Sequence, residues 1–276
     1  MTPKLPTLPP TIGVFDSGFG GLTVLRALLP LIPGAHYIYL GDTARLPYGS
    51  KSRETITRYA VSSAKFLEEQ GADLLVIACN TASALSLEDI QQALPIPVVG
   101  VIQPGAQAAL ATAKVGQPQP SVLVLATTAT TQSRAYTQSL NALGLAATEK
   151  ACPLLVPLVE EGWIDHHVTA EVLRIYLNEA FAEAPNAQTL LLGCTHYPLL
   201  QPLIERTLAE LNHPMTIIDS AAATAARVAE HFAPNPAGVP ATSRFYATDS
   251  IEKFQRLGSS FLGHSLAEVQ LLDLGG

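Results

Sequence analysis

Short apolar runs rich in Val, Ile and Leu alternate with longer helical patterns along most of this 276-residue chain, and this alternation limits the fold more than any other feature. The predicted strands are residues 12–15, 37–40, 74–78, 97–101, 121–126, 146–151 and 189–192. The predicted helices are residues 22–31, 53–70, 82–94, 131–143, 169–184 and 199–211. Strands separated by helices form parallel sheets covered on both faces, which explains why these strands are almost wholly apolar. The sequence therefore predicts an α/β protein with doubly wound parallel sheets.

The two halves of the chain share one local design. An apolar strand runs into a cysteine and a polar cluster in both Leu74–Thr81 and Leu190–Thr195. Each half also begins with an apolar strand, residues 12–15 and 122–125, that ends at a short polar turn. Ligands of open parallel sheets bind beyond the carboxyl ends of the strands. We therefore expect two pseudo-symmetric domains with the active site in the cleft between them.

The tail of the chain adds further strand and helix patterns. The predicted first domain comprises residues 11–102 and 214–276, and the predicted second domain comprises residues 103–213. The return of the tail to the first domain rests on the tendency of chain termini to lie close together. Residues 1–10, four of which are proline, are expected to form a flexible arm.

The composition narrows the compartment and the partners. Hydrophobic residues make up 48% of the chain and charged residues only 14%, against roughly 25% charged residues in a typical soluble protein. The formal net charge of −7 argues against nucleic acid or an anionic membrane as the main partner. The most apolar helical stretch is interrupted by Arg26 and Pro30, so no membrane span is expected. Three cysteines and no signal peptide favour reduced thiols in a cytoplasmic protein.

The two strand-end cysteines are the leading candidates for chemistry. The alternative is that both are buried core residues, because a free cysteine behaves as a small hydrophobe. Here Cys79 and Cys194 each open a polar cluster, residues 79–81 and 194–196, where the strand ends. An unperturbed thiol has a pKa of about 8.5, and nearby donors or a helix N-terminus make its thiolate accessible. His196 is a candidate partner for Cys194 because it lies two residues further on.

A glycine-rich turn, residues 16–21, follows the first strand. It differs from a dinucleotide-binding fingerprint, because Thr23 occupies the position of the third glycine. A tight turn that lets backbone amides approach a small anion is the better interpretation, with Asp16 and Ser17 facing the cleft. A plain helix cap is the alternative role for Asp16.

Two further segments offer groups for a small anion. Residues 41–52 lack the Gly-Lys pair of a phosphate-binding loop, but the backbone amides of Tyr48 and Gly49 are available to a side-chain carboxylate. Thr127 and Thr130 place hydroxyl groups at the start of a helix, where capping and anion binding are both compatible with the sequence.

Metal and cofactor sites are not indicated. Cys194 with His196, and the pair His166 and His167, lack the ligand spacing of a zinc site. No lysine is interpreted as the site of a pyridoxal Schiff base. We therefore expect an enzyme without metal or cofactor.

Several of these segments together resemble a known family. Residues 12–24 are similar to the N-terminal signature of glutamate racemases, in the aspartate/glutamate racemase superfamily. The pair Gly41-Asp42, the loop Pro47–Gly49, and the clusters Cys79–Ala82 and Gly193–Leu199 are similar to further motifs of that family. The resemblance covers most of the chain, and the motifs are highly specific in combination.

The resemblance implies a cofactor-independent isomerase that interconverts L- and D-glutamate and supplies D-glutamate for peptidoglycan. It implies that Cys79 and Cys194 are the acid/base thiols, serving D- and L-glutamate respectively, with Asp16 assisting Cys79 and His196 assisting Cys194. The substrate-contacting positions that it implies are Ser17, Pro47, Tyr48, Gly49, Asn80, Thr81, Thr127, Thr130 and Thr195. Asp42 and Glu160 match acidic residues that support the site from farther out.

Two positions depart from the family pattern, and they concern local loop geometry alone. Ala126 stands where the family usually has glycine, and Gln103 stands where it often has an acidic residue. A racemase of aspartate or of a hydantoin, on the same scaffold, is an alternative enzyme. A protein that binds a small anion without turning it over is the alternative outside catalysis. A homodimer is also left open, because nothing in the sequence decides the oligomeric state.

Overall fold

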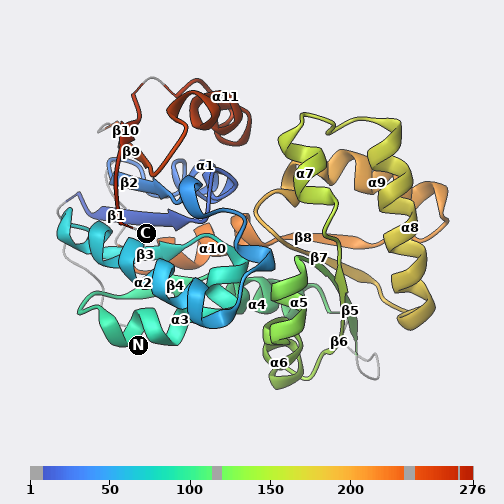
Figure 1. The fold of residues 1–276 in the computed structure, drawn as a ribbon. Coiled ribbons are helices and arrows are strands. Elements are labelled where there is room, and N and C mark those ends of the chain that lie inside the picture. The colour runs from blue at the N-terminus through green and yellow to red at the C-terminus, as the bar shows by residue number, and fades with distance from the viewer. Residues whose placement is uncertain (1–8, 114–119, 233–239, 267, 276) are drawn as a thin grey trace. The chain divides into compact units, whose positions relative to one another are not determined.

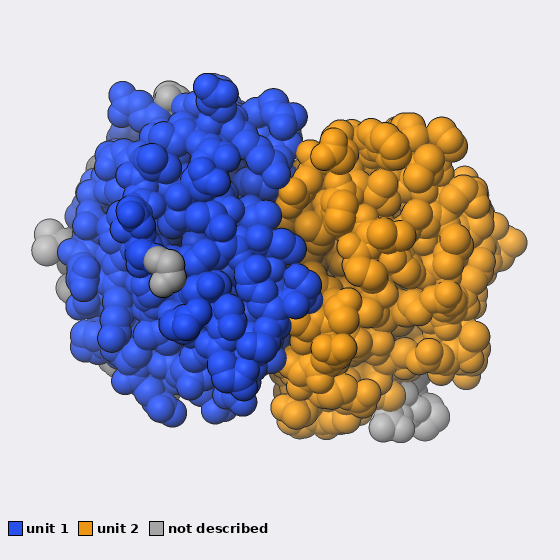
Figure 2. Space-filling model, viewed as in Figure 1, with its two compact units in different colours: residues 1–101, 221–276 blue, residues 102–220 orange. Residues whose placement is uncertain are grey.

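The computed structural model describes residues 9–113, 120–232, 240–266 and 268–275. Most of the predicted N-terminal arm, residues 1–8, lies outside the described residues. The chain divides into two compact units, shown in separate colours in Figure 2. Residues 1–101 and 221–276 form the first unit, and residues 102–220 form the second. Within the described ranges, no helix combines the length and the apolar character that crossing a membrane requires.

The first unit is built on a parallel sheet with the strand order β10-β9-β2-β1-β3-β4 (Figure 1). Its strands are β1 (Thr11–Asp16), β2 (His36–Gly41), β3 (Leu74–Ile77), β4 (Val98–Gly100), β9 (Thr242–Ala247) and β10 (Gln270–Leu271). Its helical elements are α1 (Leu22–Leu28), η1 (Thr43–Arg45), η2 (Tyr48–Ser50), α2 (Arg53–Glu69), α3 (Asn80–Ala93), α10 (Ser220–Ala229) and α11 (Ile251–Leu262). The sequence from β9 onward therefore extends the sheet formed by the first hundred residues.

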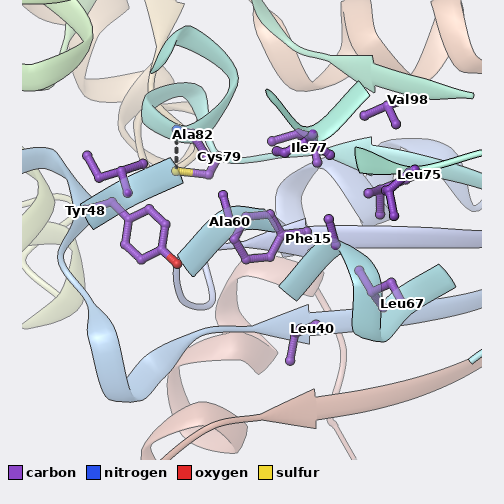
Figure 3. Packing of buried hydrophobic residues seen from close by; sticks show 14 of the residues in the cluster. Phe15, Leu40, Tyr48, Ala60, Leu67, Leu75, Ile77, Cys79, Ala82 and Val98 are labelled. Atoms are coloured by element: carbon purple, nitrogen blue, oxygen red, sulfur yellow. Dashed lines mark hydrogen bonds between the residues drawn. The ribbon is translucent and has the colours of Figure 1, made fainter. Parts of the chain in front are cut away.

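Helices cover both faces of this sheet, because successive strand residues point to opposite sides. On β2, Ile38 and Leu40 belong to a buried cluster with Phe15, Ile77 and residues of α2 and α3 (Figure 3). Tyr39 points to the other side, where its ring lies 5.9 Å from that of Phe254 on α11. The fully apolar strands predicted from the sequence are thus buried on two sides.

The second unit is built on a four-stranded parallel sheet with the order β6-β5-β7-β8. Its strands are β5 (Ser121–Ala126), β6 (Ala146–Ala151), β7 (Thr189–Gly193) and β8 (Thr216–Asp219). Its helical elements are α4 (Ile102–Thr112), α5 (Thr128–Ser133), α6 (Ala135–Ala142), α7 (Leu155–Glu160), α8 (His167–Glu183), η3 (Tyr197–Leu200) and α9 (Gln201–Glu210). Helices α4 and α6 pack together against the sheet, and α8 packs with α9.

The two sheets share one order of strands. In the first unit, β1 lies between β2 and β3, and β4 pairs with β3; in the second, β5 lies between β6 and β7, and β8 pairs with β7. By this order, β1 corresponds to β5 and β3 to β7. Cys79 follows β3 and Cys194 follows β7, so both cysteines occupy corresponding places in the topology.

The predicted fold class, with parallel sheets flanked by helices, is confirmed, while several details differ. The helix predicted over 131–143 is broken into α5 and α6 at Arg134, whose φ of 59° is incompatible with a continuous helix. The sequence did not indicate α4 or α7. The boundary predicted near residue 214 differs from the division of the structure, because β8 forms hydrogen bonds with β7 and therefore belongs to the second unit.

Candidate active site

The polar residues of the first unit gather where three neighbouring parallel strands end. Asp16 is the last residue of β1 and lies beside Gly41, the last residue of β2. The amide of Asp42 donates to the Asp16 carbonyl at 3.0 Å, and the amide of Ala78 donates to the Phe15 carbonyl at 2.8 Å. Cys79 comes next in the chain. The sheet hydrogen bonds thus bring the ends of β1, β2 and β3 to one edge.

The Cys79 thiol lies between a strand end and a helix N-terminus. Cys79 is the residue before α3, and its sulfur accepts the backbone N–H of Ala82 at 3.5 Å, the dashed line in Figure 3. The thiol donates to the Ser17 hydroxyl at 3.4 Å. Burial and, after it, the negative charge of Asp16 raise the pKa of Cys79 to about 11, while the Ser17 hydroxyl and the Ala82 amide act in the opposite direction. The free thiol is therefore protonated at neutral pH.

The glycine-rich turn after β1 is required by close packing. The backbone N–H of Gly18 donates to Asp16 Oδ2 at 2.9 Å, which holds the carboxylate beside the turn. A Cβ on Gly21 would lie 2.6 Å from the Cβ of Asp16 and 2.8 Å from that of Ala78. Only glycine fits at residue 21, so the turn keeps Asp16 close to the end of β3.

The loop Pro47–Gly49 is anchored by the side chain of Tyr48. That side chain is almost fully buried, and its hydroxyl donates to Asp42 Oδ2 at 2.5 Å. Its ring packs against Phe15 and Tyr59, with ring centroids 6.2 Å apart in both pairs. Burial, with the neighbouring carboxylate of Asp42, raises the pKa of Tyr48 far above its usual value. Tyr48 is therefore a neutral anchor of this loop.

In the second unit, Cys194 is followed at once by two polar side chains. Its sulfur lies 4.0 Å from Nδ1 of His196, and the Thr195 hydroxyl lies 3.3 Å from the same nitrogen. The other ring nitrogen, Nε2 of His196, lies 3.4 Å from Oε1 of Glu160 at the end of α7. All of Cys194, Thr195 and His196 are buried. The cluster therefore links the thiol to a carboxylate through an imidazole.

Hydroxyl groups also lie at the end of β5. Thr127 is the N-cap of α5, where its hydroxyl accepts the backbone N–H of Thr130 at 3.3 Å and lies 3.0 Å from the Thr130 hydroxyl. The hydroxyl of Tyr197 donates to the carbonyls of Ala126 and Cys152 at 3.3 and 3.0 Å. These bonds fix the turn after Cys194 to the ends of β5 and β6.

Each unit thus collects its own share of the residues singled out from the sequence. The first unit holds Asp16, Ser17, Asp42, Pro47, Tyr48, Gly49, Cys79, Asn80 and Thr81. The second unit holds Thr127, Thr130, Glu160, Cys194, Thr195 and His196. Asn80 and Thr81 are the buried first residues of α3, directly after the Cys79 thiol. Their roles in chemistry stay predictions.

Three participating side chains were missed from the sequence: Arg45, Thr248 and Tyr197. Arg45 Nε donates to Asp42 Oδ1 at 2.9 Å, and the Thr248 hydroxyl donates to the same oxygen at 2.9 Å. The family-like motifs pointed to Tyr197 only as a neighbour of His196. A buried carboxylate such as Asp42 needs compensating donors, which is the one signal that could have prompted a search for them.

No group of three or more His, Cys, Asp or Glu side chains in the described part of the chain is arranged to hold a metal ion. The independence from cofactors therefore stays a prediction from the sequence.

The two α/β units have parallel sheets of matching strand order, and a cysteine follows β3 in the first unit and the corresponding strand β7 in the second. Each sheet thus carries one thiol at the edge where open parallel sheets bind their ligands. The model of the Asp/Glu/hydantoin racemase family matches residues 13–228. The chain belongs to this family of racemases.

Individual relatives are similar over nearly their whole length. The chain is 48% identical to a glutamate racemase of Koribacter versatilis, with 97% of this chain and 98% of that protein covered. The structure of glutamate racemase from Francisella tularensis, in complex with D-glutamate, is similar with a TM-score of 0.85 and 34% identity, covering 96% and 98% of the two chains. Glutamate racemase from Thermus thermophilus, in complex with β-chloro-D-alanine, is similar with a TM-score of 0.84 and 39% identity, covering 98% and 99%.

Proposed function

We propose that this chain is a cofactor-independent glutamate racemase of the cytoplasm that interconverts L- and D-glutamate and supplies D-glutamate for peptidoglycan. The observation that carries the proposal is the pair of strand-end cysteines, Cys79 and Cys194, at corresponding places of two sheets. The near full-length similarity to glutamate racemases supports the choice of substrate.

Inversion of an α-carbon requires a base on one face and an acid on the other. In the proposed reaction the thiolate of one cysteine removes the α-proton, and the thiol of the other returns a proton to the opposite face. The two thiols then act on opposite faces of the same substrate carbon. Binding alone has no need of two such thiols, so their presence favours catalysis over simple capture of an anion.

The burial of Cys79 sets a condition on this chemistry. Its pKa of about 11 keeps the thiol protonated before substrate binds. The ammonium group of a bound amino acid favours the thiolate, as do the Ser17 hydroxyl and the Ala82 amide that already contact the sulfur. We propose that substrate binding itself brings Cys79 into its ionised form.

The carbanionic intermediate has no cofactor to delocalise its charge. In the proposal, hydrogen-bond donors at the two strand ends stabilise the charge that develops on the substrate carboxylate. The residues assigned to this contact are Ser17, Asn80, Thr81, Thr127, Thr130 and Thr195. Exclusion of water strengthens these interactions, because the local dielectric constant falls.

The partners of the two thiols have separate assignments. Asp16 assists proton transfer at Cys79, and His196 assists it at Cys194. Glu160 is assigned the task of orienting the imidazole, because its Oε1 lies 3.4 Å from Nε2 while Nδ1 lies 4.0 Å from the Cys194 sulfur. The roles of Asp16 and His196 are therefore not interchangeable.

Glutamate differs from smaller substrates by its side-chain carboxylate. We assign its recognition to the backbone of the loop Pro47–Gly49, which Tyr48 anchors through Asp42. A shorter acid such as aspartate, or a hydantoin, remains the alternative substrate within the family. Incubation of the purified protein with each L-acid distinguishes these proposals.

The test is loss of optical rotation of L-glutamate together with chiral chromatography of the D-enantiomer. We expect equal amounts of both enantiomers at the end, with the same rate after exhaustive dialysis against a chelator and after hydroxylamine treatment. Racemisation of aspartate or a hydantoin in preference to glutamate would overturn the substrate assignment. Absence of turnover with all three, despite binding, would favour the anion-binding alternative.

A further inference from the structure

Asp42 is a fully buried carboxylate whose two oxygens are held by three side chains. Oδ1 accepts from Arg45 Nε and from the Thr248 hydroxyl, both at 2.9 Å, and Oδ2 accepts from the Tyr48 hydroxyl at 2.5 Å. A buried carboxylate is stable only when hydrogen-bonded and compensated in charge. The position of Asp42, and through it that of Tyr48, is thus fixed by all three donors together.

One of these donors comes from a distant part of the chain. Thr248 follows β9 and lies 206 residues after Asp42 in the sequence. The match to the racemase family ends at residue 228, so Thr248 lies beyond it. The Thr248 hydroxyl also accepts the backbone N–H of Ala44 at 2.9 Å, and the Thr248 amide donates to the Gly41 carbonyl at 3.2 Å. The turn after β9 is therefore bonded to the chain on both sides of Asp42.

We infer that Thr248 is a positioning residue for glutamate recognition, acting through Asp42 and Tyr48 on the backbone of the loop Pro47–Gly49. The inference rests on the proposed function, because it assumes that this loop binds the side-chain carboxylate of glutamate. Thr248 itself touches neither the thiol nor the loop backbone in any contact that the structure records. Its effect is expected on substrate binding rather than on proton transfer.

Arg45 and Thr248 contribute differently to the same carboxylate oxygen. Arg45 supplies the positive charge, and its guanidinium lies 4.5 Å from the centroid of the Tyr59 ring. Its loss would leave a buried charge uncompensated and so destabilise the whole unit. Thr248 is neutral and supplies only a directed hydroxyl, so its replacement tests geometry with a smaller cost in stability.

The experiment uses the full-length enzyme with Thr248→Val, which removes the hydroxyl and keeps the branched shape. We expect KM to rise about fivefold to twentyfold for both glutamate enantiomers, with kcat within about twofold of the parental value, because a hydrogen bond to a charged group is lost from the binding loop. Both KM values rise because both enantiomers carry the same side-chain carboxylate. Thr248→Ser keeps the hydroxyl and should restore KM.

Thr43→Val is the matched control. The Thr43 hydroxyl bonds the carbonyl and the amide of Asp249 in the same turn, at 2.6 and 2.8 Å, and makes no bond to Asp42. This variant should leave KM near the parental value even where thermal unfolding shows a lower Tm. Thr248→Ala removes the same hydroxyl with less bulk and carries the test if the valine variant does not fold.

A double variant shows whether the effect passes through Asp42. Tyr48→Phe by itself should raise KM. The double variant Tyr48→Phe/Thr248→Val should raise KM by less than the product of the two single increases, because both side chains act on one carboxylate. The inference would be overturned if KM were unchanged in both Thr248→Val and Thr248→Ala, or if Thr43→Val raised KM as much as Thr248→Val. Racemase activity of the parental protein would still uphold the proposed function in either case. A parental protein without racemase activity on glutamate would overturn both.

Discussion

Cys79 and Cys194 follow corresponding strands, yet their surroundings differ in kind. Cys79 is contacted by the Ser17 hydroxyl and a backbone amide, and feels the negative charge of Asp16. Cys194 instead lies near the imidazole of His196, which in turn lies near Glu160. The backbone design is thus repeated, while the polar partners of the thiol are not.

The difference begins at the neighbouring strand of each sheet. β1 ends in Asp16, whereas the corresponding strand β5 ends in Ala126, followed by Thr127. The first unit therefore supplies its acid from the adjacent strand, and the second supplies a histidine from the turn after the cysteine itself. Topology places a thiol at the edge of a sheet, and individual side chains decide how readily it ionises. The two thiols should consequently respond differently to the same kind of substitution.

The largest effect is expected from removing either thiol. Cys79→Ala and Cys194→Ala should each reduce racemisation by at least about a thousandfold, because no second proton carrier remains. In deuterated water, Cys194→Ala should exchange only the α-proton of D-glutamate, and Cys79→Ala only that of L-glutamate. Chiral chromatography with mass spectrometry measures both quantities.

Cys152→Ala provides the control for these two variants. Cys152 is a third buried cysteine, in the second unit, whose thiol donates to the Lys150 carbonyl at 3.6 Å. Its replacement should preserve the parental rate. A single variant at residue 79 or 194 that exchanged both enantiomers equally would remove the distinction between the thiols.

A smaller effect is expected from the thiols' partners. Asp16→Asn and His196→Asn should each reduce kcat by about tenfold to a hundredfold, since each removes an assisting acid/base group. The equilibrium constant of a racemase is one, so kcat/KM stays equal in both directions and the asymmetry must be sought elsewhere. With substrate deuterated at the α-carbon, the isotope effect on kcat/KM should increase for D-glutamate in Asp16→Asn and for L-glutamate in His196→Asn. If the isotope effect changed equally for the two enantiomers in both variants, these side chains would merely hold the fold.

The fold was largely predictable because parallel strands buried on both faces are continuous apolar runs. The run before Cys79 is such a strand, and it was identified without knowledge of its neighbours. The break at Arg134 was not, because a left-handed residue other than glycine or asparagine leaves no common sequence signal. The sheet to which β8 belongs could not be deduced either, since its hydrogen bonds to β7 follow from tertiary packing.

The candidate site was likewise predictable only in part. Side chains at or just after the ends of strands, such as Asp16 and Cys79, were visible because the carboxyl ends of parallel strands share one edge. Thr248 was invisible, because its contact with Asp42 spans 206 residues and joins two segments without a shared motif. The resemblance gave Glu160 only as an acidic residue that supports the site from farther out, and the structure places its Oε1 3.4 Å from Nε2 of His196.

A third prediction concerns the carboxylate behind His196. Glu160→Gln should lower kcat by about tenfold, since loss of a partner that orients an imidazole typically costs about this much. The isotope effect on kcat/KM for L-glutamate should increase, as in His196→Asn, but by a smaller amount. Glu149→Gln is a control in the same unit, because the Glu149 carboxylate accepts hydrogen bonds from the amide and the hydroxyl of Thr137, and these bonds involve neither thiol. If the isotope effect on kcat/KM changed equally for D- and L-glutamate in Glu160→Gln, Glu160 would not act on the Cys194 side.

The smallest expected effect tests the electrostatics of Cys79 directly. The pKa of this thiol lies above its usual value, at about 11, and Asp16 contributes to the rise because its negative charge opposes a neighbouring thiolate. Replacing Asp16 with Asn must therefore lower the pKa of Cys79 and increase the thiolate fraction at pH 8. In a Cys152→Ser/Cys194→Ser background, alkylation of Cys79 at pH 8 should become about twofold to tenfold faster, with its pH profile displaced to lower pH.

Ser17→Ala should act in the opposite direction, because the Ser17 hydroxyl stabilises the thiolate. If both variants shifted the profile in the same direction, altered access to the thiol rather than charge would account for the change, and the electrostatic contrast between the two cysteines would not hold.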